Sequence, residues 1–522
     1  MLELANTNTT ILFLTVTNGY VSDDLGAGVL LDNTTASLIA SNCVFCGNSG
    51  AEFGGAIFTW GAVTLDGCVV SGNSASVYGG GIYSYGGSVT LNNCGVIGNS
   101  VFDGGGGGIE SEFGPLTLNN CNVSGNFATI FGGGVDSEDE GTLAATNCVF
   151  AGNSSGTGGG LFIETPATLS YCTFSNNIST NGAGGGIDNY GTSALNSCLF
   201  SGNSVTNNNG MGGGLINSGI LMMNNCTVSG NSAPNGSGGG ICNLDTLTAS
   251  NCSVYGNSAS ENRWGGGIYN DFGGLTLDNC TLAGNSATNG NGGGLASFNA
   301  TNVLVNCTIS SNSAIYAGGL LDAGASTFAL TNTIVAGNFA PDSPDIAASY
   351  SGLANFIGGN PELAPLGSYG GPTQTMPPLP RSPVIDAGTD WVTNFLATDQ
   401  RGYPRLAGAH VDIGAVEAQT APANDRPVLQ NARIYLNGVP GLVPGTFFGF
   451  SFTNVPNADF TVLTSTNLTL PLAQWTVLGN APPDSVPGQY EFFDQLHTTA
   501  GGVGTNVAVV FNPQKFYRVV SP

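Results

Sequence analysis

Basic residues are almost absent from this sequence of 522 residues. It has eight Lys and Arg against 33 Asp and Glu, and its formal net charge is −25. Within residues 1–350, Arg263 is the only Lys or Arg and stands against 22 acidic residues. Nucleic acids and anionic lipids are bound through Lys and Arg, so we expect neither as a partner. A cation or a neutral ligand fits this charge better.

Long apolar runs are missing as well. No stretch of about 18 apolar residues occurs, which predicts that the chain has no transmembrane segment. The first residues, MLELANTNTTILFLTVTNG, lack the basic start of a signal peptide and already alternate like a strand. We therefore take the chain as a mature or truncated form, or as one with a misplaced start.

Cysteine and asparagine, by contrast, recur at a fixed spacing. Eleven of the thirteen cysteines are 24 to 28 residues apart, and Thr333 continues their series. An apolar residue follows each by two positions, an asparagine follows by five, and a GGGI-like segment lies between successive cysteines. A fixed period of this size with short apolar alternation predicts a solenoid. The series consists of Cys43, Cys68, Cys94, Cys121, Cys148, Cys172, Cys198, Cys226, Cys252, Cys280 and Cys307, with Asn48, Asn73, Asn99, Asn126, Asn153, Asn177, Asn203, Asn231, Asn257, Asn285, Asn312 and Asn338.

Each repeat is interpreted as one coil of a parallel β-helix. The Leu-Thr-Leu segment before a cysteine is one strand, the Asn-Asn step turns the chain, and the cysteine begins a second strand. The GGGI segment then turns into a third strand, and the general crossover preference makes the coil right-handed. We predict an all-β solenoid of about 13 coils over residues 1–350. Its asparagine side chains should stack and hydrogen-bond along the axis.

The cysteine series indicates a stacked apolar column rather than disulfides or a metal site. Adjacent rungs of parallel strands hold their Cβ atoms about 4.8 Å apart, whereas a disulfide prefers about 3.8 Å. Zinc sites need clusters such as paired C-x-x-C motifs, and the pair Cys43 and Cys46 has no second pair or histidine to complete it. Cys46 and Cys242 lie outside the series, and we expect Cys242 to face outward.

Several repeats resemble a known family. Gly54–Ile57 (GGAI) with Phe45–Asn48 (FCGN), and a GGGL segment with Phe200–Asn203 (FSGN), resemble the GGA[ILV] and FxxN repeats of polymorphic outer membrane proteins. Those proteins are β-helical passengers of bacterial surface proteins and are implicated in adhesion. The resemblance implies an extracellular or cell-surface location and an adhesive role.

The periodicity ends near residue 351, where proline becomes frequent. Asn360–Gly388 and Asp399–Glu417 look like the choice-of-anchor Q domain of bacterial secreted and surface proteins, which implies export and a position after a β-helix. We expect this domain at 351–419, capping the open edge of the last coil. Residues 420–427 (TAPANDRP) indicate a linker, and alternation in 428–522 predicts a small β-sandwich-like module.

Catalytic signatures are sparse in the solenoid. Both histidines, His410 and His497, lie outside it, so a Ser-His-Asp triad is excluded there. Right-handed β-helices host pectin lyases and polygalacturonases, but a lyase needs an Arg or Lys base, and only Arg263 is present. The hydrolase pattern of paired aspartates with Gly-His-Gly and Arg-x-Lys is missing. An inverting hydrolase with two carboxylates remains open.

One face of the coils is predicted to carry aromatic and acidic side chains. In the strand after GGGI the isoleucine points inward, so the residues one and three positions later point outward. Carboxylates on adjacent rungs repel unless a cation or a hydrogen-bonding ligand lies among them, and hard oxygen ligands suit Ca²⁺, with an affinity on the order of millimolar. Alternatively, the stripe reflects strand propensity and solubility alone. The ligand-binding candidates are Phe58, Trp60, Tyr83, Tyr85 and Tyr190, and the candidate weak calcium ligands are Glu110, Glu112, Asp136, Glu138 and Glu164.

These observations favour an exported or cell-surface β-helix protein that acts as a non-catalytic binding or adhesion rod. The expected partner is a polysaccharide or the surface of a host or neighbouring cell, and no cofactor is required besides the weak Ca²⁺ site. A carbohydrate-active enzyme on the same face, related to glycoside hydrolases or polysaccharide lyases, is the alternative. A purely structural spacer is the second alternative.

Overall fold

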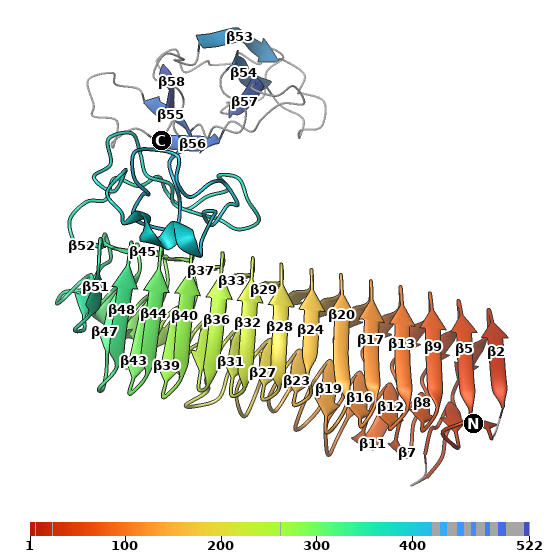
Figure 1. Cartoon of the computed structure of the whole chain (residues 1–522). Coiled ribbons are helices and arrows are strands. Elements are labelled where there is room, and N and C mark those ends of the chain that lie inside the picture. Colours follow the sequence, from red (N-terminus) through yellow and green to blue (C-terminus); the bar gives the residue numbers. More distant parts are fainter. Residues whose placement is uncertain are drawn as a thin grey trace, which may run out of the picture. The chain divides into compact units, whose positions relative to one another are not determined.

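The computed structural model of the chain describes residues 1–5, 7–22, 25–260 and 263–419, and beyond them the backbone of six strands. The chain forms two compact units, Met1–Gly359 and Asn360–Pro522. The first unit is a rod of stacked coils, coloured red to green in Figure 1. Among the described residues, no helix has the length and hydropathy that a membrane span requires.

Three parallel sheets of fourteen strands run along the rod within the described residues, and each coil contributes one strand to each sheet. Sheet A consists of β1 (Leu2–Leu4), β4 (Val29–Leu31), β8 (Ile57–Thr59), β12 (Ile82–Tyr85), β16 (Ile109–Glu112), β19 (Val135–Glu138), β23 (Leu161–Ile163), β27 (Ile187–Asn189), β31 (Leu215–Asn217), β35 (Ile241–Asn243), β39 (Ile268–Asp271), β43 (Leu295–Phe298), β47 (Leu320–Asp322) and β50 (Ile346–Ala347). Sheet B consists of β2 (Asn8–Leu12), β5 (Ser37–Ser41), β9 (Ala62–Asp66), β13 (Ser88–Asn92), β17 (Pro115–Asn119), β20 (Thr142–Thr146), β24 (Ala167–Ser170), β28 (Thr192–Asn196), β32 (Ile220–Asn224), β36 (Thr246–Ser250), β40 (Gly274–Asp278), β44 (Thr301–Val305), β48 (Thr327–Thr331) and β51 (Ser351–Leu353). Sheet C consists of β3 (Thr15–Thr17), β6 (Val44–Cys46), β10 (Val69–Ser71), β14 (Gly95–Ile97), β18 (Asn122–Ser124), β21 (Val149–Ala151), β25 (Thr173–Ser175), β29 (Leu199–Ser201), β33 (Thr227–Ser229), β37 (Ser253–Tyr255), β41 (Thr281–Ala283), β45 (Thr308–Ser310), β49 (Ile334–Val335) and β52 (Phe356–Ile357).

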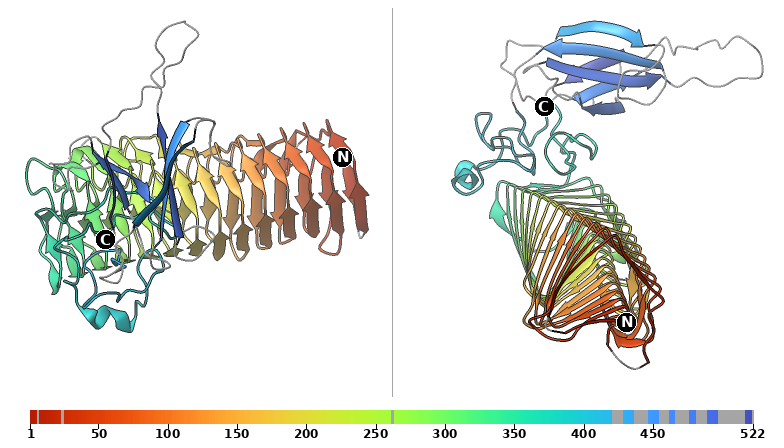
Figure 2. Two further views of the ribbon diagram at one scale, coloured as in Figure 1. Left: turned by 90° about the horizontal axis from the view of Figure 1, so that it is seen from above. Right: turned by 90° about the vertical axis from the view of Figure 1, so that its right-hand side faces the viewer.

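This architecture confirms the predicted right-handed parallel β-helix. The strands of each sheet pair in register, as in Ile109 with Val135 and Glu110 with Asp136. Viewed along the axis, successive coils superimpose (Figure 2, right). One coil precedes the cysteine series and the last follows it, so the rod has fourteen coils rather than about thirteen.

A fourth column of short strands follows sheet C in most coils, which the sequence analysis did not predict. It stands between the asparagine series and the glycine run, where the sequence is rich in Ser and Ala. Its two sheets consist of β7 (Ala51–Phe53), β11 (Ser74–Tyr78) and β15 (Ser100–Val101), and of β22 (Ser154–Ser155), β26 (Ile178–Ser179), β30 (Ser204–Val205), β34 (Ser232–Ala233), β38 (Ser258–Ser260), β42 (Ser286–Asn291) and β46 (Ser313–Tyr316).

Left-handed backbone conformations form the corners of each coil. In one coil, φ is 53° at Asn120 between sheets B and C, 64° at Gly125 and 49° at Gly132. Glycine adopts this region freely, and asparagine is among the side-chain-bearing residues that tolerate it. This is why an asparagine so often stands directly before the cysteine.

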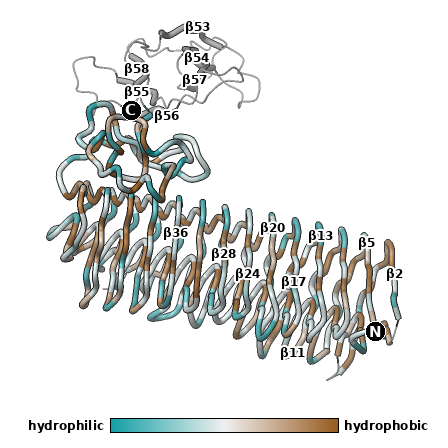
Figure 3. The backbone as a smooth tube through the Cα atoms, in the orientation of Figure 1, coloured by the Kyte–Doolittle hydropathy of each residue, from teal (hydrophilic) through white to brown (hydrophobic). Residues whose placement is uncertain are grey.

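The interior of the rod is a continuous apolar core. The inward residues of sheets A, B and C stack on apolar residues one coil away, and most are fully buried. Phe150, Phe174 and Phe200 form a stack with ring centroids 4.8 Å apart and interplanar angles of 3° and 8°. Hydrophobic and hydrophilic segments alternate within every coil (Figure 3), so the burial of one apolar face per strand holds the coils together.

The asparagine series forms the predicted ladder inside the rod. The Oδ1 atom of each asparagine accepts both the backbone N–H and the side-chain amide of the asparagine one coil before, as with Asn153 and Asn126 at 3.0 Å each. At the C-terminal end of the ladder, Asp345 takes this role and accepts both donors of Asn338 at 3.0 Å. Each carboxamide is therefore satisfied although it is buried.

The cysteine series lies in the core beside this ladder. All thirteen cysteines are in the described part of the chain and carry free thiols; twelve are buried and Cys46 is half-buried. The thiols donate weakly to backbone carbonyls, as from Cys121 to Leu91 O at 3.4 Å. The side chain of Cys242 projects from the outer face of sheet A, but it is fully buried. It does not face solvent as expected, because a further segment of each coil packs over that face.

We expect a thiol reagent to modify the native protein at no more than one cysteine, Cys46. The other thiols become accessible only on unfolding, because they are buried among apolar side chains. Alkylation followed by mass spectrometry should show thirteen labels after denaturation without a reductant. Several protected pairs that appear only after reduction would contradict the assignment of free thiols.

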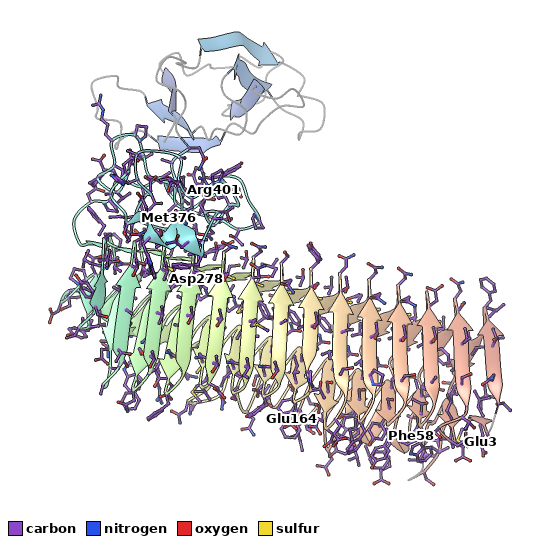
Figure 4. All side chains as sticks on the ribbon, in the orientation of Figure 1. Glu3, Phe58, Glu164, Asp278, Met376 and Arg401 are labelled. Carbon is purple, nitrogen blue, oxygen red and sulfur yellow. The ribbon has the colours of Figure 1, made fainter. Side chains whose placement is uncertain are left out.

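The second unit has little regular structure over residues 360–419, apart from the short 3₁₀-helix η1 (Asp390–Asn394). Buried charges join its loops: Arg401, labelled in Figure 4, donates to Asp399 from Nε at 2.9 Å and from Nη2 at 2.6 Å. Glu417 accepts the backbone N–H groups of Ala407 and Asp412. The charged residues of 399–417 thus act in holding this unit together.

Beyond residue 419, the described strands form two antiparallel sheets of three strands. They are β53 (Val428–Tyr435), β54 (Thr446–Thr453) and β57 (Gln489–Leu496), and β56 (Thr476–Asn480), β55 (Thr461–Ser465) and β58 (Phe516–Val520). The linker expected at residues 420–427 lies outside the described residues.

Candidate functional site

The first outward column of sheet A is buried rather than exposed. Phe58 and Tyr83 expose 2% and 5% of their surface and pack with Leu30 in one cluster, against which Phe53 and Tyr78 pack from outside. The expectation that Phe58 and Tyr83 present their rings to solvent is therefore wrong. Alternation fixes the face of the sheet from which a side chain emerges, but a further segment of each coil folds over that face.

The residue directly before each glycine run covers the outer face of sheet A. Its carbonyl accepts a glycine N–H from the coil before, as in Gly54 to Tyr78 at 3.0 Å and Gly79 to Gly105 at 3.2 Å. These residues therefore stack from coil to coil over sheet A, and we call them the cover column. Its members are Phe53, Tyr78, Gly105, Phe131, Thr157, Ala183, Met211, Ser237, Trp264, Asn291 and Tyr316.

The other aromatic candidates lie at the rim of this covered layer. Tyr85 and Tyr190 are 43% and 52% exposed. Trp60 is half-buried and contacts Phe58 edge-on, with ring centroids 4.5 Å apart. These three rings are the members of the predicted aromatic set that a ligand could reach.

Three of the five acidic candidates come together. Carboxylate oxygens of Glu110, Asp136 and Glu138 lie within 4.8 Å of one another. Glu112 is held apart by Tyr83, whose hydroxyl donates to its Oε1 at 2.8 Å. Glu164 is exposed (Figure 4). We call Glu110, Asp136 and Glu138 the carboxylate cluster.

Burial controls the protonation of this cluster. It raises the pKa of Glu110 and of Asp136 well above the usual carboxyl range, and the charge of Glu138 raises both further, while a hydrogen bond with Glu110 lowers the pKa of Asp136. The pKa of Glu138 is raised to about 7, first by burial and then by Glu164. These acids are therefore costly to ionise without a compensating positive charge.

A second candidate site, which the sequence analysis did not select, lies at Trp264 in the cover column. A cavity of about 220 Å³ opens there, lined by side chains of mixed character. Trp264 stacks on Phe298 with ring centroids 5.8 Å apart and 11° between the planes, and its ring lies 5.5 Å from Tyr269. The lining includes the aromatic Trp264 and Tyr269, the polar Asn209 and Ser237, and the charged Arg263 and Asp271.

The polar groups of this pocket are only partly satisfied. Arg263 donates to Asn209 Oδ1. Asp271 Oδ1 is buried and has no hydrogen-bond partner among the described residues. Burial raises the pKa of Asp271, while Tyr269 lowers it. An aromatic surface, a guanidinium cation and a carboxylate acceptor thus line one small cavity.

The sequence holds a signal for this pocket. The residue before GGG is Ala183, Met211 and Ser237 in the three preceding coils and Asn291 in the following one, and Trp264 is the single large aromatic residue among them. The sequence analysis weighed Arg263 only as a lyase base and did not select Trp264, because nothing in the alternation predicts that the cover column lies over sheet A.

Two coils of the rod match a known family of repeats. The chain matches the Chlamydia polymorphic membrane protein repeat at residues 42–59 and 67–85. Among solved structures it is similar to the pectate lyase Pel9A, at 11% sequence identity over 79% of this chain and 97% of that chain, with a TM-score of 0.30. No curated protein matches the chain.

Proposed function

We propose that this chain is an exported, non-catalytic β-helix protein that binds carbohydrate through the pocket beside Trp264. The observation that carries the proposal is the meeting of an aromatic ring, the guanidinium of Arg263 and the unpaired Asp271 Oδ1 in one cavity. Aromatic surfaces with a few convergent polar groups are typical of small-ligand sites. A sugar ring has an apolar face for the indole and hydroxyls for the polar groups.

The size of the pocket favours recognition of part of a longer chain. Its volume of about 220 Å³ is below the range of about 300–1,000 Å³ in which drug-sized ligands are enclosed. A polysaccharide would place one residue in the pocket and continue over the surface of the rod. The rings of Trp60, Tyr85 and Tyr190 would then be further contact points for the polysaccharide on the same side of the coils.

The residues of the pocket and of the carboxylate cluster favour binding without cleavage. Among the described residues that line the pocket, Asp271 is the only carboxylic acid, whereas glycoside hydrolysis commonly uses two. At the carboxylate cluster, Glu110 and Asp136 are completely buried, which keeps them from a polymer substrate. The alternative of a carbohydrate-active enzyme on this face has less support for both reasons.

Export is the part of the proposal that rests on resemblance. The match to the polymorphic membrane protein repeat covers two coils. The similarity of Asn360–Gly388 and Asp399–Glu417 to the choice-of-anchor Q domain of secreted proteins points the same way. An adhesive role would follow if the bound carbohydrate belongs to a cell surface.

A glycan array with the purified chain tests the proposal. We expect the chain to retain a subset of polysaccharides, and Trp264→Ala to lose at least about tenfold in affinity, since a buried aromatic contact accounts for 1.4 kcal/mol or more. Asp271→Asn, which keeps the shape of the pocket, should weaken binding as well.

The matched control is Tyr171→Asn. Tyr171 is an exposed aromatic residue in a left-handed corner where most coils have asparagine, so its replacement should leave fold and binding intact. Retention of the same glycans at the same affinity by Trp264→Ala would refute the pocket as the site. Failure of the wild-type chain to retain any glycan would refute carbohydrate binding itself.

A further inference from the structure

Glu110 and Asp136, two members of the carboxylate cluster, are neighbours in the first outward column of sheet A, which is buried and mostly apolar. Across the sheet, Glu110 pairs with Tyr83 on one side, and Asp136 pairs with Phe162 on the other. Phe162 in turn packs against Phe131 of the cover column, with ring centroids 4.7 Å apart. Two acidic side chains thus stand directly beside each other in a buried row whose one other buried acid among the described residues is Asp188, two coils further on.

Neither of these buried acids is satisfied by the protein. Glu110 and Asp136 are both 0% exposed. Apart from the contact between the two carboxyl groups themselves, their four oxygens have no hydrogen-bond partner in the part of the chain that the structure describes. A buried ionised carboxylate without a partner is strongly destabilising, so the pair is either kept protonated or neutralised by a bound cation.

Residues 1–350 offer no compensating charge near the cluster. Arg263 is the only Lys or Arg in residues 1–350, and it belongs to the pocket beside Trp264. The third member, Glu138, is half-buried and adds a further negative charge at the edge of the cluster.

The cover column carries no side chain above the cluster. In this coil its member is Gly105, within the run Gly104–Gly108, the only run of five glycines in the sequence. A Cβ atom on Gly105 would lie 2.1 Å from Asp136 Oδ2 and 3.0 Å from Glu110 Oε2. The absence of a side chain there lets the backbone close directly onto the carboxylates, where adjacent coils place Tyr78 and Phe131.

From this arrangement we propose that Glu110, Asp136 and Glu138 bind one divalent cation, Ca²⁺, beneath the glycine run. Three carboxylates supply oxygen ligands only, which suits a hard cation. Ca²⁺ accepts six to eight oxygens in flexible geometry, whereas Mg²⁺ demands a near-octahedral site and gives up its water reluctantly. Zn²⁺ prefers the nitrogen and sulfur ligands that this cluster lacks. The inference is independent of carbohydrate binding.

The ion would join two successive coils. Glu110 belongs to β16, and Asp136 and Glu138 belong to the adjacent β19. Because an ion bound only by the folded chain stabilises it, Ca²⁺ should raise the melting temperature in a concentration-dependent way.

Terbium luminescence gives the most direct test, since Tyr83 and Tyr78 lie beside the cluster and can sensitise a bound Tb³⁺. The full chain is freed of metal with a chelator and titrated with Tb³⁺, and then with Ca²⁺ or Mg²⁺ as competitors. We expect saturation at one ion per chain, displacement by Ca²⁺ at lower concentration than by Mg²⁺, and a rise in melting temperature with Ca²⁺ alone.

Glu138→Gln is the informative variant, because this half-buried residue can change with little risk to the fold. It should weaken Ca²⁺ binding at least tenfold, while the matched control Glu164→Gln, an exposed acid of the next coil, should bind like the wild type. Gly105→Ala should abolish the Tb³⁺ signal, since its Cβ would displace Asp136 Oδ2.

Two results would overturn the proposal. One is a wild-type chain in which Ca²⁺ neither shifts the melting temperature nor displaces Tb³⁺. The other is equal Ca²⁺ affinity in the wild type and in the double variant Glu110→Gln with Asp136→Asn. In the first case the buried acids are held in their protonated form, and in the second the ion binds elsewhere.

Discussion

Replacing Asn153 with leucine is expected to lower the free energy of unfolding by about 3 kcal/mol. The Asn153 side chain accepts two hydrogen bonds from Asn126 and donates to Val123 O at 2.9 Å and to Asn177 Oδ1 at 3.0 Å. Leucine fits an apolar core, but it leaves two buried donors of Asn126 without acceptors. Each buried donor that loses its acceptor costs about 1–3 kcal/mol of stability.

Urea denaturation followed by circular dichroism measures this loss. The matched control is Asn122→Leu, the same substitution at an exposed position of β18, which should change stability by no more than about 0.5 kcal/mol. Equal denaturation midpoints for Asn153→Leu and the wild type would show that the ladder contributes nothing to stability.

Replacing Gly185 with alanine is expected to destabilise the rod by about 3 kcal/mol or more. A Cβ there would lie 2.3 Å from Gly213 O and 2.7 Å from the backbone N and O of Ser204. All three atoms belong to the backbone of the next coil, so relief requires the coils to move apart. Overpacking of this kind commonly costs about 1–3 kcal/mol even where side chains can adjust.

Gly274→Ala separates steric conflict from the general effect of glycine replacement. A Cβ on Gly274 meets nothing within 4 Å, and this glycine lies in an exposed strand position of β40. It should leave stability unchanged or raise it by up to about 1 kcal/mol. Equal effects of the two variants would contradict the close approach of the glycine runs.

The coil was predictable because its signals are local and repeated. The αL corner before each cysteine, the apolar residue two positions later and the ladder asparagine recur at nearly constant spacing, and each has a direct physical cause. Stacking in register then follows, since only that arrangement pairs asparagine with asparagine and phenylalanine with phenylalanine.

The covered layer was not predictable from the same signals. Alternation correctly sends Phe58, Tyr83 and Glu110 out of the opposite face of sheet A from Ile57, Ile82 and Ile109, but it is silent on what lies beyond that face. The cover column depends on hydrogen bonds between residues about 26 positions apart. The run Gly104–Gly108 marks the one place where two local patterns, five glycines and a following acidic pair, could have indicated a special site.

The two candidate sites differ in kind. The carboxylate cluster is buried and would serve the integrity of two coils, whereas the pocket beside Trp264 reaches the surface and can meet a polymer. Loss of Ca²⁺ binding in Glu138→Gln should therefore leave glycan retention intact. This separation keeps the failure of one proposal from being mistaken for the failure of the other.

The proposed function requires that the pocket beside Trp264 binds carbohydrate without cleaving it. The most direct measurement is a calorimetric titration of a retained oligosaccharide into the wild type and Trp264→Ala, followed by mass spectrometry of the sugar. We expect saturable heat in the wild type, at least tenfold weaker binding in the variant, and sugar recovered at its original mass. Shortened or unsaturated products, or identical affinity of both proteins, would contradict it.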